Sequence, residues 1–128
     1  MKAIEPVMDP VGRLLLAAIF LMSGVGKTGA IEGTQQYMEA FGLPGVLIYP
    51  TIAFEVFVGA AFVVGWQTRA AALLLAGFSL LSALIFHTDF GNQMQMLMFL
   101  KNLAIAGGFL MAYRLGAGAY SLDRRMVG

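Results

Sequence analysis

Residues 46–66 read VLIYPTIAFEVFVGAAFVVGW, an apolar run with one carboxylate, Glu55, near its middle. A helix needs about 17–25 mostly apolar residues to cross a bilayer, and this run is that long. Three further apolar stretches lie at residues 14–26, 70–86 and 96–113, and the first is long enough once the residues just before it are counted. Lipid offers backbone N–H and C=O groups no water, so such stretches must be helices. The sequence predicts an all-α polytopic membrane protein, a bundle of four transmembrane helices.

Composition agrees with this class. Hydrophobic residues make up 59% of the 128 residues and charged residues 12%, against about 25% charged in typical soluble domains. The length allows four spans with short connections, so we expect residues 1–128 to form a single domain. The chain has no cysteine, which excludes disulfides, thiolate metal sites and thiol–disulfide exchange by its own residues. We expect no metal ion and no nucleic-acid partner.

The distribution of arginine and lysine predicts the orientation. We interpret the first apolar stretch as a retained helix and not as a cleaved signal peptide. With four spans, the two termini and the turn at residues 67–69 share one side of the membrane. That side carries six basic residues against two on the other, namely Lys2, Arg13, Arg69, Arg114, Arg124 and Arg125 against Lys27 and Lys101. By the positive-inside rule, both termini are expected in the cytoplasm.

The first external connection, residues 28–45, contains a helical pattern of its own. Tyr37, Met38 and Phe41 fall on one helical face that ends at a Gly-Leu-Pro stop at residues 42–44. This spacing predicts a short amphipathic helix that lies on the outer surface or caps the bundle.

Ionisable residues inside the spans are the candidate functional residues. Glu55 lies roughly 13 Å below the outer boundary at 1.5 Å per residue, and Lys101 lies at a similar height in the fourth span. Lys27 and His87 end the first and third spans. A charge within a span is costly unless it is paired, so we expect Glu55 to pair with Lys101 and Lys27 to remain as excess positive charge. The outward-opening cluster, with Asn102 beside Lys101, would bind an anionic or carbonyl-bearing ligand.

Structural explanations exist for each of these residues. Lys27 could extend its charge to the membrane surface, and His87 could be an interfacial histidine without a catalytic role. The buried ion pair of Glu55 could serve only to hold two helices together. We assign no catalytic residue from the sequence.

An ordered pattern of small and polar residues runs through the whole chain and resembles the DoxX family of small bacterial membrane proteins. Its parts are Arg13…Ser23-Gly24-x-x-Lys27, Glu55-x-x-x-Gly59, Gly65-x-x-Thr68-Arg69, Ala83-x-x-x-His87, Lys101-Asn102-Leu103-Ala104-x-x-Gly107-Gly108 and Gly116-x-Gly118-x-x-Ser121-Leu122-Asp123. The resemblance implies a multi-pass protein of the bacterial inner membrane. It also implies a relation to the small subunit of thiosulfate:quinone oxidoreductase and, in some members, work with thiol-oxidising or superoxide-removing partners.

Three classes of function are compatible with these observations. The first is a redox-associated subunit of a quinone-linked oxidoreductase, with a quinone or small-anion site at Lys27, Glu55, His87, Lys101 and Asn102. Because the chain lacks cysteine, any sulfur chemistry would belong to a substrate or to a soluble or membrane redox partner. The second is an assembly protein that binds partners or a second copy of itself and has a purely structural ion pair. The third, a transporter, lacks a polar path through the cytoplasmic half of the spans.

The predicted orientation can be measured with reporter fusions. A reporter fused after Arg125 should be active only if it is of a type that works in the cytoplasm. The basic residues are expected to keep that end of the chain on the cytoplasmic side of the membrane. A tag inserted at Glu32 should be accessible from outside the cell. A C-terminal tag that is accessible from outside would reverse the orientation.

Overall fold

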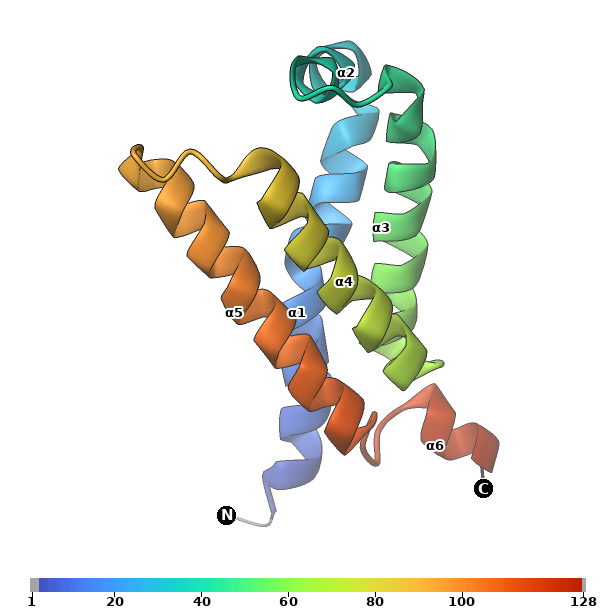
Figure 1. Cartoon of the computed structure of the whole chain (residues 1–128). Helices are drawn as coiled ribbons and strands as arrows, with labels where there is room; N and C mark the ends of the chain where they lie inside the picture. Colours follow the sequence, from blue (N-terminus) through green and yellow to red (C-terminus); the bar gives the residue numbers. More distant parts are fainter. Residues whose placement is uncertain (1–2, 128) are drawn as a thin grey trace.

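The computed structural model describes residues 3–127 and has the expected architecture (Figure 1). Within this range, four helices are long and apolar enough to cross a membrane. The elements in chain order are α1 (Glu5–Thr28), α2 (Ile31–Ala40), the short 3₁₀ helix η1 (Gly45–Leu47), α3 (Ile48–Val64), α4 (Thr68–Phe86), α5 (Gln93–Leu115) and α6 (Leu122–Val127). The all-α, four-helix prediction is confirmed. The amphipathic helix predicted in the first connection is α2.

Local sequence explains where several helices begin and end. α1 begins earlier than its apolar stretch, at Glu5, whose negative charge favours the first turn of a helix. α3 ends at Gly65, which has a φ of 75° and adopts the left-handed conformation that glycine tolerates best. α5 begins after Asn92, whose side chain accepts hydrogen bonds from the backbone N–H groups of Met94 and Gln95.

The helices pack as two pairs. α1 lies along α3, and α4 lies along α5, while α3 also contacts α4 (Figure 1). Gly59 of α3 allows close approach within the first pair, because a Cβ there would lie 3.2 Å from a methyl group of Leu21. The pairs meet at Phe109, whose ring packs edge to face on Phe20 and Phe62 with ring centroids 5.6 Å and 5.0 Å away.

Arg13 joins the C-terminal segment to the start of the bundle. Its side chain is only 5% exposed, and its guanidinium donates hydrogen bonds to the backbone carbonyls of Val63, Ala117 and Tyr120. The carboxylate of Asp123 accepts hydrogen bonds from the backbone N–H groups that begin α4. α6 therefore lies at the same end of the molecule as the start of α1 (Figure 1). Which side of the membrane this end faces stays a prediction.

Arg13 should contribute to stability through these backbone contacts more than through its charge. Arg13→Met removes the donors of three carbonyls, and an unsatisfied buried polar group costs about 1–3 kcal/mol. We expect the free energy of unfolding in detergent micelles to fall by about that amount. The control is Arg114→Met, which removes the same charge from an exposed position. Equal stability of the two variants would contradict this role for Arg13.

Candidate functional site

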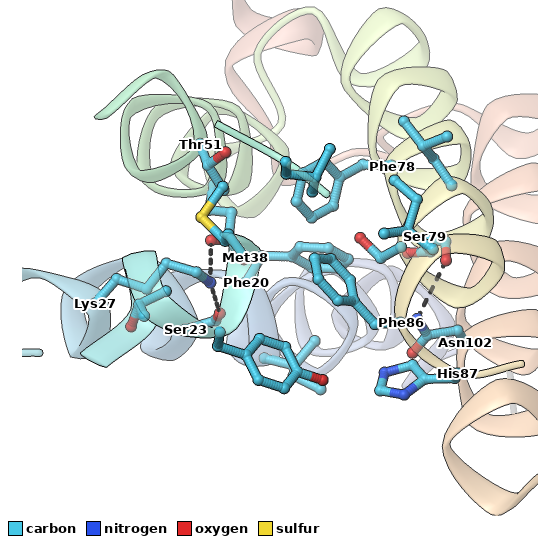
Figure 2. A pocket seen from close by; sticks show the side chains of 18 of the residues that line it. Phe20, Ser23, Lys27, Met38, Thr51, Phe78, Ser79, Phe86, His87 and Asn102 are labelled. Atoms are coloured by element: carbon cyan, nitrogen blue, oxygen red, sulfur yellow. Dashed lines mark hydrogen bonds and ion pairs between the residues drawn. The ribbon is translucent and has the colours of Figure 1, made fainter. Parts of the chain in front are cut away.

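A cavity of about 400 Å³ lies among α1, α2, α3, α4 and α5, toward the end of α4 that carries His87 (Figure 2). Four of the five candidate residues from the sequence line it: Lys27, Glu55, His87 and Asn102. The remaining lining is mostly aromatic and aliphatic, with hydroxyl groups between. The structure therefore brings together side chains from four separate helices around one cavity.

Lys27 and Glu55 form an ion pair in this cavity. The Nζ atom of Lys27 lies 2.7 Å from Oε1 of Glu55, and it also donates a hydrogen bond of 2.6 Å to Oγ of Ser23 (Figure 2). The Glu55 side chain is 3% exposed and that of Lys27 is 22% exposed. Gly24 permits the pairing, because a Cβ there would lie 2.7 Å from the Val56 side chain and 3.2 Å from Cβ of Glu55. The small residue lets α1 and α3 approach closely enough for the two charges to meet.

The predicted pairing of Glu55 with Lys101 is wrong. Lys101 is exposed on α5 and does not line the cavity. Its height along the membrane agrees with that of Glu55, but helical rise gives no information about which face of a helix a residue occupies. One step further along α5, Asn102 faces inward and donates a hydrogen bond of 3.1 Å to the backbone carbonyl of Ser79 (Figure 2). The expectation that Lys27 carries uncompensated positive charge is also wrong, because Glu55 neutralises it.

Ser79 is a site residue that the sequence reasoning missed. It is 3% exposed, and within the described residues its Oγ atom has no hydrogen-bond partner. A buried hydroxyl without a partner is unusual and is satisfied when a ligand or water binds. Ser79 precedes His87 by two helical turns, so a search for polar residues on the His87 face of α4 would have found it.

His87 lies at the end of α4, and one of its ring nitrogens takes part in a hydrogen bond. Its Nδ1 atom forms a hydrogen bond of 3.0 Å with Oε1 of Gln95, which holds the ring in place. This leaves Nε2 without a hydrogen-bond partner among the described residues. His87 lines the cavity beside Phe86 (Figure 2).

Aromatic rings form flat walls in the cavity. Phe78 stacks on Phe54 with ring centroids 5.1 Å apart, and Phe86 stacks on Tyr37 of α2 at 5.3 Å. Tyr37 and Met38 of α2 thus form part of the cavity wall, and of the two positions predicted for this helix the structure favours the one over the bundle. Among the described residues, no three His, Cys, Asp or Glu side chains are grouped closely enough to hold a metal ion.

Comparison with known proteins identifies relatives along nearly the whole chain. The DoxX family model matches residues 9–88, which include Lys27, Glu55 and His87. The inner membrane protein YqjF of Escherichia coli (strain K12) is 47% identical over 97% of this chain and 95% of its own length. The inner membrane protein YphA of the same organism is 37% identical over 96% of this chain and 93% of its own length.

A more partial match is a Bacillus subtilis (strain 168) protein named "Putative oxidoreductase CatD". It is 33% identical over 57% of this chain and 54% of its own length. No solved structure matches the chain.

The contact between Lys27 and Glu55 can be tested with a double-mutant cycle. Glu55→Gln or Lys27→Met alone leaves one charge without its partner in an apolar setting, so each should destabilise the bundle more than the double variant does. We expect a coupling free energy of about 0.5–3 kcal/mol in detergent unfolding experiments. In the control cycle, Glu55→Gln and Lys101→Met should lower the free energy of unfolding additively. Additive losses for the first cycle would contradict the pairing.

Proposed function

The chain belongs to the DoxX family of inner-membrane proteins, and we propose that its cavity binds the ring of a quinone as part of a redox system in that membrane. The observation that carries this proposal is an aromatic-walled cavity in which the two charged residues of the described lining, Lys27 and Glu55, compensate each other. A volume of about 400 Å³ lies within the range of about 300–1,000 Å³ that small-molecule sites occupy.

Charge compensation favours a neutral ligand over a small anion. Within the described lining, Lys27 and Glu55 are one cation and one anion in contact, so the cavity has no excess positive charge to attract a sulfur oxyanion. The ammonium group of Lys27 has three donors, of which Ser23 and Glu55 take two. The third donor suits a carbonyl oxygen. The flat faces of Phe78 and Phe86 suit a planar ring.

Groups that handle protons lie within the same cavity. Reduction of a quinone to a quinol takes up two electrons and two protons, so a site that supports it needs a route for protons. His87 and Glu55 line the cavity, and both side chains are of types that serve as general acids or bases in enzymes. Ser79 also lines the cavity, and its buried hydroxyl would donate to a ring oxygen after turning toward the ligand.

The electrons would have to come from a partner. The chain contains no cysteine, and thiol oxidation would therefore take place on a separate protein or substrate. The partial similarity to a protein with oxidoreductase in its name supports a redox setting for this family member. We therefore propose a quinone-binding subunit that works with a redox partner.

A second candidate function is assembly without catalysis. Lys27 is satisfied by Ser23 and Glu55 in the absence of any ligand, so the pair is also suited to a purely structural role between α1 and α3. An assembly protein of this kind would keep its function when both charges are removed together.

Quinone binding can be tested with the full chain in lipid nanodiscs and a short-tailed ubiquinone or menaquinone analogue. Ser79→Ala and His87→Ala should each weaken binding by about 2–10-fold, because each removes one hydrogen bond worth about 0.5–1.5 kcal/mol. Lys101→Gln, outside the cavity, should bind as the parent does. Calorimetric titration measures the dissociation constants. If the parent binds neither analogue, the assembly function replaces this one.

A further inference from the structure

A second hollow, of about 570 Å³, lies at the opposite end of α4 from the quinone cavity. It forms where the start of α4 meets the end of α5 and the segment that leads into α6 (Figure 1). Arg69 and Arg124 line it together with Thr68, Gly116 and Ser121. We refer to it as the Arg69–Arg124 hollow.

The two arginines of this hollow have guanidinium N–H donors that make no hydrogen bond to the described residues. Nε of Arg69 donates to the carbonyl of Tyr113 at 2.9 Å, which fixes the side chain and leaves its two terminal nitrogen atoms without a partner among the described residues. The Arg124 guanidinium is exposed and makes no hydrogen bond to the described residues. Neither arginine forms an ion pair within residues 3–127.

The one carboxylate that lines the hollow is already engaged. The oxygens of Asp123 accept hydrogen bonds from the backbone N–H groups of Gln67 and Thr68, at 2.7 Å and 2.9 Å. Burial alone would raise the pKa of Asp123, but hydrogen bonding from the side chain and backbone of Thr68 and from the backbone of Gln67, with the nearby guanidinium of Arg13, outweighs burial and lowers the pKa. The carboxylate stays ionised and directed at the α4 backbone, so the hollow keeps a positive charge on its two arginines.

The hollow lies at the ends of two helices that are long and apolar enough to span a membrane, where lipid headgroups are expected. It is bounded by Thr68, where one spanning helix begins, and by Leu115, where another ends. Exposed aromatic residues with polar groups surround this end of the bundle, namely Trp66, Tyr113 and Tyr120. Tryptophan and tyrosine collect at the boundary between lipid and water. Leu115 itself is 74% exposed, which offers apolar surface directly beside the arginines.

We propose that the Arg69–Arg124 hollow binds the phosphate of an anionic phospholipid. Guanidinium groups bind phosphate oxygens through paired N–H donors, and this hollow is lined by two arginines that form no ion pair with the described residues. The adjoining apolar surface of Leu115 would receive an acyl chain, which a free phosphate ion could not use. Recognition therefore combines a phosphate with a hydrocarbon chain, and the site is independent of the quinone cavity.

The test uses the full chain in mild detergent and measures lipid binding by native mass spectrometry. Phosphatidylglycerol should bind more tightly than phosphatidylcholine, and inorganic phosphate at the same concentration should not displace it. Arg124→Gln should weaken phosphatidylglycerol binding by about fivefold, since one basic residue near an anionic headgroup contributes about a factor of that size. Arg125→Gln is the matched control, because Arg125 is an exposed neighbour of equal charge that does not line the hollow.

Three results would overturn the proposal. The first is equal binding of the two lipids by the parent protein. The second is an equal loss in Arg124→Gln and Arg125→Gln, which would indicate diffuse attraction to the basic surface. The third is displacement of the lipid by inorganic phosphate, which would make the occupant a soluble phosphate. The unfolding midpoint of Arg124→Gln in phosphatidylcholine should match that of the parent, because its side chain has no structural partner.

Discussion

A charge buried in an apolar bundle must be compensated, and the contact between Lys27 and Glu55 meets this requirement. The pair fixes how close α1 and α3 lie, and Gly24 provides the space that this distance demands. It also determines the character of the cavity, because two opposite charges in contact leave a polar site with no net charge. Around this pair, α2 and α4 supply aromatic rings that line the cavity.

The two ends of α4 carry different chemistry. One end, at His87, faces a cavity lined by rings and by a compensated ion pair. The other end, at Thr68, is capped by Asp123 and lies beside two arginines that form no ion pair within residues 3–127. A single spanning helix thus separates a neutral site within the bundle from a positively charged site at its boundary. Such a separation suits a protein that contacts a membrane-soluble ligand and a charged headgroup at once.

Hydropathy was sufficient to predict the four spans, because lipid leaves the backbone no alternative to a helix. Glu55 stood out for the same reason, as a carboxylate that no shift of helix boundaries could remove from the membrane. The predicted partner of Glu55 was wrong, because a sequence pattern gives the height of Lys101 in the membrane but not the face of α5 on which it lies. The contacts of Arg13 were not predictable at all. The acceptors are backbone carbonyls, which every residue has, so no residue type in the sequence identifies them.

The contacts of Arg13 also have a consequence for biosynthesis. A ribosome makes α1 first, yet two of the three carbonyls that Arg13 requires belong to Ala117 and Tyr120, near the end of the chain. Until those residues have been translated, the guanidinium of Arg13 lacks two of its three acceptors. The contacts that bury Arg13 are therefore among the last to form as the chain is made.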